Sequence, residues 1–406
     1  MAQADTLTLQ HTIWELDQTY VMPTYRRMPT LFVRGSGARL YDEQGNAYLD
    51  FLAGIAVCAL GHCHPRMVRR LQQQAETLIH VSGLLLTEPV ARLAQKLCTI
   101  SGMERAFFCN SGAEACETAI KIIRKHANAV KQTPDYEILV LEGSFHGRTM
   151  GAVSATAQPK YQEPFKPLLP GFRVVPRNDI EALESAFSER TAGILLEPIQ
   201  GESGIHPLSE EYLRTARALC DRYNALMAVD EVQSGIGRTG KWFAYQHTDV
   251  LPDLVAVAKG LGGGIPIGAC LARGHAATLL QPGEHGSTFG GNPLATATAL
   301  EVLQTIEDED LLTHAARIGD SLRTQLAHLQ SDGAPIAEIR GKGLMLGVQL
   351  TQPIARTVAQ KAFEKRLIIN AVGDWVLRLV PPLIITEADV QESVQILHSV
   401  FKEVSV

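Results

Sequence analysis

The sequence lacks any apolar run long enough to cross a membrane, because none of its 406 residues falls in a window of 18 uncharged apolar positions. It also lacks a marked excess of either charge, with 37 Lys and Arg against 43 Asp and Glu and a net charge of −6. This balance argues against a general electrostatic attraction to nucleic acid or anionic lipid. Its seven cysteines, odd in number and scattered, are typical of reduced thiols rather than a disulfide framework. With no basic-then-apolar export signal at the N-terminus, we expect a cytoplasmic protein without nucleic-acid or membrane partners.

Several chemical signatures are missing as well. There is no CxxC or HExxH pattern, and the adjacent residues His62, Cys63 and His64 cannot all reach one ion, so we expect loop residues there and no metal site. The absence of a GxSxG motif gives a serine hydrolase little support. Repeats and low-complexity tracts are also absent. With 46% hydrophobic residues, the chain has enough apolar material to fold into a large enzyme-like body or two to three domains.

The middle of the chain alternates short apolar runs with helical patterns. The strand-like runs cover 137–143, 192–199, 226–231 and 253–260, and helical patterns include 112–128 and 209–223. Such alternation predicts an α/β fold with a mostly parallel central sheet flanked by helices. Glu197, Asp230 and Lys259 stand near the ends of three runs, where α/β sheets place functional groups.

The two ends of the chain have a different pattern of predicted helices and strands. Beyond about residue 300, long amphipathic helices are followed by the strand-like runs EIRGKGLMLGVQL and VLRLVPPL, and the N-terminal stretch resembles a hairpin through 42–46. We therefore expect a large domain over 76–300 and a smaller α+β domain built from both ends, with 1–75 contributing to it and 301–406 forming the rest.

The segment 107–127 predicts a well-capped helix. Ser111 and Glu114 have the spacing of a capping box, and acids precede bases along the helix as its dipole favours. The glycine-opened N-terminus could present free N–H groups to a phosphate. An ordinary capped helix also explains the segment, and on these residues alone it is the preferred interpretation.

Two ionisable residues end apolar runs. Asp230 could form a salt bridge, bind a metal or accept a hydrogen bond from a protonated ring nitrogen. Burial would lower the pKa of Lys259 and favour amine chemistry with an aldehyde, unless its side chain simply reaches solvent. The nearby stretch 235–241 has the spacing of a phosphate-binding loop, but Trp242 stands where Ser or Thr is required, which argues against a nucleotide site.

Taken together, eight motifs occur in the order in which one enzyme family has them. They are YDEQGNAYLDFLAGIAVCALGHCHP, NSGAEA, FHGRT, EPIQGE, DEVQSGIGRTG, AKGLGGGIPIGA, GSTFGGNP and RGKGLMLG. The chain thereby resembles the class III aminotransferases among the fold-type-I pyridoxal-phosphate enzymes, most closely those acting on acetylornithine and succinylornithine. The resemblance implies the cofactor pyridoxal 5'-phosphate and a homodimer with shared active sites.

The resemblance also implies roles for cofactor-binding residues. Lys259 matches the catalytic lysine that bonds the cofactor and moves the proton, and Asp230 matches the carboxylate that keeps the pyridine nitrogen protonated. Gln233 would contact the phenolic oxygen and Phe145 would stack on the ring. The phosphate would be bound by Ser111, Gly112 and Ala113, and by Thr288 from the neighbouring subunit.

Substrate-binding roles follow in the same way. Arg148 would bind a substrate carboxylate, with Ser287 near the bound ornithine derivative. Glu202 and Arg378 resemble a paired switch for a second carboxylate, although a surface glutamate and a strand arginine would explain them too. Cys116 departs from the more usual asparagine of NSGAEA(N).

The implied reaction moves the terminal amine of N2-acetyl-L-ornithine to 2-oxoglutarate, giving N-acetyl-L-glutamate 5-semialdehyde and L-glutamate in arginine biosynthesis. The alternatives are succinylornithine, ornithine or γ-aminobutyrate aminotransferases and, more remotely, a nucleotide- or cofactor-binding protein without turnover. The segment HVSGLLLTEP, where asparagine and aromatic residues are more usual, leaves the acyl preference open.

Overall fold

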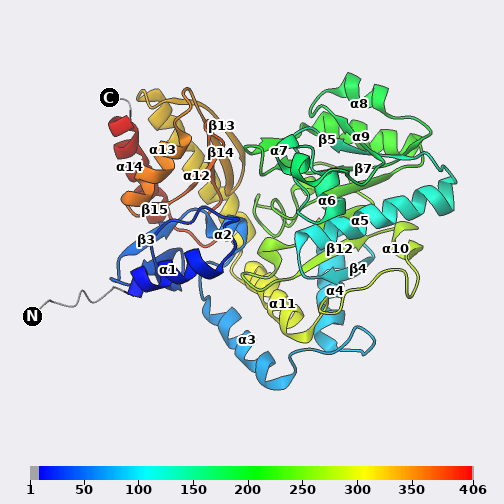
Figure 1. Ribbon diagram of the computed structural model, residues 1–406, viewed down its shortest axis with the longest axis horizontal. Coiled ribbons are helices and arrows are strands. Elements are labelled where there is room, and N and C mark those ends of the chain that lie inside the picture. Colours follow the sequence, from blue (N-terminus) through cyan, green and yellow to red (C-terminus); the bar gives the residue numbers. More distant parts are fainter. Residues whose placement is uncertain (1–8, 405–406) are drawn as a thin grey trace, which may run out of the picture.

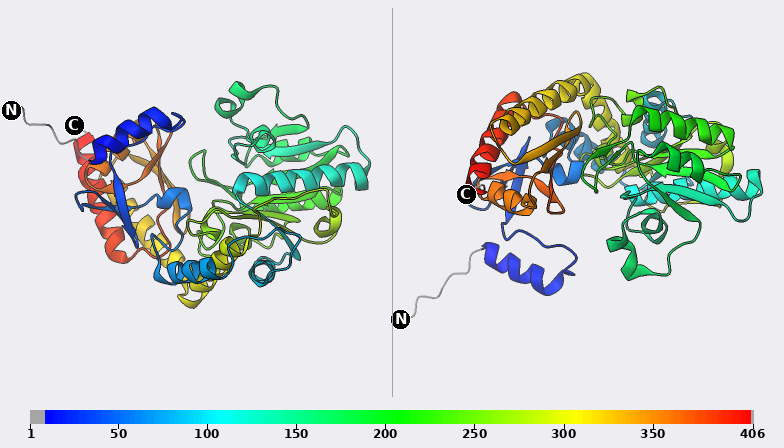
Figure 2. Two further views of the ribbon diagram at one scale, coloured as in Figure 1. Left: turned by 60° about the horizontal axis from the view of Figure 1, so that its bottom comes forward. Right: turned by 90° about the horizontal axis from the view of Figure 1, so that it is seen from above.

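The computed structural model describes residues 9–404 and arranges them as two lobes side by side (Figures 1 and 2). The large lobe is built on a seven-stranded sheet of residues 105–272, and the small lobe on two four-stranded sheets from residues 32–50 and 336–379. Among the described residues, no helix is long and apolar enough to cross a membrane. The first eight residues, on which the expectation about export partly rests, lie outside the described range.

The seven-stranded sheet confirms the expected mostly parallel architecture. Its order is β4 (Arg105–Cys109), β12 (Gly268–Ala272), β11 (Leu254–Val257), β10 (Leu226–Asp230), β7 (Thr191–Leu196), β5 (Glu137–Leu141) and β6 (Phe172–Val175). Only β12 runs against its neighbours β11 and β4. Every residue of β7, β10 and β11 is buried, because helices cover the sheet, and this explains why these strands read as continuous apolar runs.

Helices and short elements complete the large lobe (Figure 1). They are α4 (Glu88–Ser101), α5 (Gly112–His126), α6 (Met150–Ala155), α7 (Pro159–Gln162), α8 (Ile180–Ala186), β8 (Ile199–Gln200), β9 (His206–Pro207), α9 (Glu210–Arg222), α10 (Ala276–Leu279) and α11 (Pro293–Asp308), with single turns at 127–131, 163–165, 244–247 and 259–261. Helix α5 packs on β11 and β12 through an apolar stripe that includes Ala119, Ile120 and Ile123. This contact fixes the N-terminus of α5 near the carboxyl ends of the strands.

The small lobe joins the two ends of the chain. Its sheets have the orders β1 (Phe32–Ser36), β2 (Arg39–Asp42), β3 (Ala47–Asp50), β15 (Leu367–Ile368) and β13 (Ile336–Lys342), β14 (Met345–Leu350), β17 (Val376–Leu379), β16 (Asn370–Val372). Its helices are α1 (Leu9–Tyr20), α2 (Ala53–Ala56), α12 (Leu311–Ser331), α13 (Ala355–Glu364) and α14 (Glu387–Val404). Helix α3 (Pro65–Thr77) follows α2 in the chain and packs on α11 of the large lobe. Strand β3 pairs in parallel with β15, so Leu49 lies opposite Leu367. The domain boundaries named from the sequence stay a prediction.

The loop after β10 is held by a buried carboxylate. Glu231 is 0% exposed and accepts hydrogen bonds from the Ser234 hydroxyl at 2.6 Å and the Tyr245 backbone N–H at 2.9 Å. Burial raises the pKa of Glu231 to about 7, even though these donors stabilise its charge. The same loop contains Arg238, whose buried guanidinium donates to the carbonyl groups of Leu344 and Pro381. The segment that resembles a phosphate-binding loop is thus packed against the C-terminal part of the chain.

Glu231→Gln should weaken the pH dependence of folding stability. A carboxyl group whose pKa is higher in the folded than in the unfolded protein favours folding below the unfolded pKa, and this contribution is lost as pH rises through about 7. Between pH 5 and pH 8 the unmodified protein should therefore lose on the order of 3 kcal/mol of unfolding free energy more than the variant. Urea unfolding at the two pH values measures the difference. The exposed Glu211→Gln serves as the control, and equal pH dependence in all three proteins would contradict the prediction.

Candidate active site

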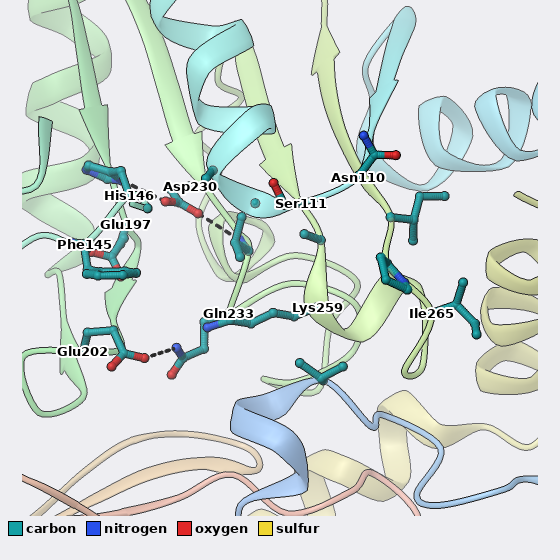
Figure 3. Close-up of a pocket in the computed structure, with 18 of the residues that line it drawn as sticks. Asn110, Ser111, Phe145, His146, Glu197, Glu202, Asp230, Gln233, Lys259 and Ile265 are labelled. Carbon is teal, nitrogen blue, oxygen red and sulfur yellow. Dashed lines mark hydrogen bonds and ion pairs between the residues drawn. The ribbon is translucent and has the colours of Figure 1, made fainter. Parts of the chain in front are cut away.

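A cavity of about 330 Å³ lies at the carboxyl ends of the large-sheet strands (Figure 3). Its walls come from the ends of β7, β10 and β11, the start of α5, and the segment after α2. The lining residues are Val57, Asn110, Ser111, Gly112, Ala113, Phe145, His146, Gly147, Glu197, Glu202, Asp230, Val232, Gln233, Ala258, Lys259, Gly264, Ile265, Pro266 and Ile267. Open α/β sheets bind ligands at this edge, so the fold itself marks the cavity as a candidate active site.

Asp230 is the last residue of β10 and is only 4% exposed. Its carboxylate accepts hydrogen bonds from His146 Nδ1 at 2.7 Å, from the Val232 backbone N–H at 3.0 Å and from the Cys116 thiol at 3.3 Å. These three donors offset the cost of burying an ionised carboxylate. Asp230 therefore presents a hydrogen-bonded carboxylate at the wall of the cavity.

Lys259 lies just after the end of β11, the strand next to β10. The apolar run predicted a strand over 253–260, but β11 ends at Val257 and Lys259 begins a short helical turn with a φ of +40°. Burial lowers the pKa of Lys259, an effect that the carboxylate of Glu202 opposes. Its side chain extends across the cavity, as Figure 3 shows. A left-handed backbone at a non-glycine residue is costly, and such positions cluster at functional sites.

The N-terminus of α5 opens onto the cavity. Ser111 caps it by accepting the Glu114 backbone N–H at 3.2 Å, as the capping-box spacing predicted. The Glu114 carboxylate accepts a hydrogen bond from the Asn110 backbone N–H at 2.8 Å. In a standard capping box the corresponding donor is the N-cap residue itself, one position later. A Cβ on Gly112 would lie 2.6 Å from Val232, so only glycine fits at the first position of the helix. Gly112 and Ala113 line the cavity, and backbone N–H groups in the first turn of a helix have no partner within the helix.

A three-residue cluster connects the two lobes at the rim of the cavity. Arg378 of β17 donates to Glu202 Oε1 at 2.5 Å and to Gln233 Oε1 at 3.2 Å, and Gln233 Nε2 donates to Glu202 at 3.1 Å. Burial alone would raise the pKa of Glu202, but the charges of Arg378 and Lys259 outweigh it and lower that pKa. Arg378 is 2% exposed, so these hydrogen bonds offset the cost of burying its guanidinium group.

Three of the residues singled out from the sequence do not themselves line the cavity. Arg148 is exposed, and its guanidinium lies over the Tyr161 ring, 4.1 Å from its centre, and 5.4 Å from the centre of the Phe145 ring. Ser287 accepts a hydrogen bond from the Asn110 side chain at 3.1 Å in a neighbouring depression. Thr288 is exposed. Within one chain these three do not join the cavity wall, and their roles stay predictions.

Sequence reasoning missed His146 and Asn110 as site residues and noted Glu197 only as the end of an apolar run. Glu197 is buried and accepts the backbone N–H groups of Phe145 and Gly201 at 2.9 and 3.1 Å. Burial raises the pKa of Glu197 to about 7. The signal for His146 was its place in the FHGRT motif, but nothing in the spacing showed that its ring would meet Asp230.

Comparison with known proteins agrees with this geometry. Residues 20–401 match the family described as aminotransferase class-III. An acetylornithine aminotransferase of Caldanaerobacter subterraneus is 49% identical over 96% of this chain and 98% of its own length. The acetylornithine aminotransferase of Methanocaldococcus jannaschii is 46% identical over the same shares.

Solved structures give the same result. The ornithine aminotransferase of Toxoplasma gondii has a TM-score of 0.94 at 35% identity and covers 98% of this chain and 96% of its own. The acetylornithine aminotransferase of Elizabethkingia anophelis has a TM-score of 0.88 at 34% identity, covering 98% of this chain and all of its own. The chain therefore belongs to the class-III aminotransferases, enzymes of fold type I that depend on pyridoxal phosphate.

Proposed function

We propose that this aminotransferase transfers the terminal amino group of N2-acetyl-L-ornithine to 2-oxoglutarate, giving N-acetyl-L-glutamate 5-semialdehyde and L-glutamate, in arginine biosynthesis. The relatives at 46–49% identity that are named acetylornithine aminotransferases support this substrate. Ornithine is the second candidate, because the structure also superposes on the Toxoplasma gondii ornithine aminotransferase with a TM-score of 0.94. Values of kcat/KM for both donors, measured side by side, decide between them. We also propose a cytoplasmic location, which the seven free cysteines support because reduced thiols are typical of that compartment.

The groups around the cavity fit pyridoxal phosphate. The buried carboxylate of Asp230 suits a protonated pyridine nitrogen, and the first turn of α5 suits a phosphate because its N–H groups are unpaired within the helix. Phe145 offers an aromatic face, Gln233 a side-chain amide and Lys259 an amine, all on the same cavity wall. When bound, pyridoxal phosphate supplies an electron sink for the carbon that loses its proton.

Lys259 is the residue that we expect to do the proton chemistry. Its lowered pKa makes more of the neutral amine available near pH 7, which both bonding to an aldehyde carbon and accepting a proton require. Asp230 would keep the ring nitrogen of the cofactor protonated, and His146 and Cys116 orient its carboxylate. The placement of the Lys259 amine in the same cavity as Asp230, Glu202 and the α5 N-terminus is the observation that carries the proposal.

The second part of the proposal concerns two different donors in one site. Acetylornithine has one carboxylate, far from the reacting amine, whereas glutamate has two, one of them on the reacting carbon. Arg148 would bind the distal carboxylate of either, so a second cation is needed only for glutamate. Arg378 would supply it, with Glu202 neutralising the guanidinium while acetylornithine is bound. The Arg378–Glu202 ion pair at 2.5 Å, partly exposed at Glu202, supports a removable partner.

We further propose a homodimer with shared active sites. Strongly exposed apolar side chains lie around the exposed Thr288 and in the segment before α4, including Leu84 at 92%, Leu86 at 93% and Phe289 at 63%. Exposed apolar clusters of this kind mark protein–protein contacts. In a symmetric dimer, Thr288 of one protomer would reach the phosphate site of its partner.

Lys259→Ala should abolish turnover while leaving some cofactor bound through Asp230 and the α5 N-terminus. The loss should be at least about 10²–10⁴-fold, the typical contribution of a positioned acid–base group. Borohydride treatment of the unmodified enzyme followed by peptide mapping should find the cofactor on the peptide that contains Lys259. The exposed Lys241→Ala is the control and should keep its activity. A labelled peptide without Lys259 would refute the assignment.

Variants of the Arg378–Glu202 pair should separate the two half-reactions. Glu202→Ala leaves Arg378 free and should favour the reaction with glutamate and 2-oxoglutarate over the one with acetylornithine. Arg378→Ala should weaken the glutamate half-reaction by about 2–5 kcal/mol, as expected when one partner of a hydrogen-bonded charge pair is removed. Single-turnover rates of both half-reactions in both variants provide the measurement. If each substitution slows both half-reactions equally, the pair is structural and the switch must be abandoned.

Two inactive variants should restore activity when mixed if the sites are shared. Lys259→Ala removes the amine from one protomer, and Thr288→Asp places a negative charge where the partner's phosphate would bind. After subunit exchange, hybrid dimers contain one site with both residues intact, so about a quarter of the original activity should return. Activity before and after exchange is the measurement. An active monomer at assay concentration, seen by sedimentation, would rule out the shared site.

A further inference from the structure

Cys116 is a buried thiol in contact with the carboxylate at the cavity wall. It lies in the first turns of α5, is 0% exposed and points its Sγ at Asp230 Oδ2, 3.3 Å away. A different donor, His146 Nδ1, approaches the same oxygen at 2.7 Å. Cysteine thiols are weak hydrogen-bond donors and are more often buried for packing alone, so this contact requires an explanation.

The donors are distributed unequally over the two oxygens of Asp230. Oδ2 accepts two side-chain donors, from His146 and Cys116, whereas Oδ1 accepts one backbone N–H from Val232 at 3.0 Å. Each carboxylate oxygen can accept two hydrogen bonds, so Oδ1 retains capacity for another donor. The two side chains on Oδ2 therefore orient the carboxylate, and the strength of their bonds sets how much negative charge remains for a donor in the cavity.

The thiol stays protonated in this position. Burial raises the pKa of Cys116 well above its ordinary value, and the negative charge of Asp230 raises it further. Cys116 is therefore a fixed donor rather than a nucleophile. Because a thiol donates more weakly than a hydroxyl or an amide, it draws less charge from the carboxylate than either would.

We propose that Cys116 is a positioning residue whose weak hydrogen bond keeps Asp230 more basic than a stronger donor would, so that the cofactor's ring nitrogen holds its proton more tightly. This inference rests on the proposed role of Asp230 toward that nitrogen. Cys116 acts here through Asp230 and does not itself touch the substrate.

A purely structural role makes a different prediction. Cys116 packs in a small apolar cluster with Cys109, Ala115 and Ala256, so any substitution there should lower stability. Packing gives no reason for two substitutions to move the protonation of a bound ring in opposite directions. The sign of the effect therefore distinguishes a donor from a space-filling side chain.

The test is a pH titration of enzyme loaded with cofactor labelled with ¹⁵N in the ring, followed by the ¹⁵N chemical shift. Cys116→Ser supplies a stronger donor of similar size, and the midpoint at which the ring loses its proton should fall. Cys116→Ala removes the donor, and the midpoint should rise. Each shift should be about half a pH unit to one unit, the size expected for one hydrogen bond.

Two further variants make the outcome decisive. Cys109→Ser changes a thiol of the same cluster that donates to the Ser111 carbonyl group at 3.4 Å, and it should leave the midpoint unchanged. Asp230→Asn should lower the midpoint strongly, and if it does not, the proposed role of Asp230 is wrong whatever Cys116 does. If Asp230→Asn acts but the two Cys116 variants shift the midpoint in the same direction or leave it unchanged, the inference about Cys116 is overturned.

Discussion

The stabilisation of one buried negative charge at the edge of the large sheet organises the whole cavity. His146, Val232 and Cys116 donate hydrogen bonds to the Asp230 carboxylate and so offset the cost of burying it. Those donors come from the loop after β5, the loop after β10 and helix α5, so the carboxylate ties three separate elements together. Two further buried carboxyl groups lie close to it, Glu197 and Glu231, and burial raises the pKa of each to about 7.

Much of the fold could be predicted, because parallel strands covered by helices appear in the sequence as continuous apolar runs that end in a charged residue. The runs before Asp230 and Lys259 have this pattern, and Ser111 has the spacing of a helix cap. Residues that act through contacts distant in sequence have no such pattern. His146 lies 84 positions from Asp230, and their contact depends on how the loop after β5 folds back over the sheet. The turn at Lys259 was also hidden, because a left-handed backbone has no composition signal at a lysine.

At the cavity rim the two lobes meet through charged groups, in addition to the apolar contact of Ile199 and Ile205 with Met345 and Val380. Arg378 comes from the small lobe, Glu202 and Gln233 from the large one, and all three share one hydrogen-bonded cluster. The ion pair between Arg378 and Glu202 depends on the distance between the lobes. A small displacement of either lobe would separate the two groups and leave an unpaired charge at the cavity rim. Lobe position and cavity electrostatics are therefore linked.

The pairing of β3 with β15 has a consequence for how the chain is made. Leu49 emerges from the ribosome early, yet its partner Leu367 is synthesised only near the end, after the entire seven-stranded sheet. The first sheet of the small lobe must therefore wait with an unpaired edge while the large lobe forms. Such distant pairing gives a high contact order and slows folding. A chain cut before Leu367 would leave β3, made more than 300 residues earlier, without this partner.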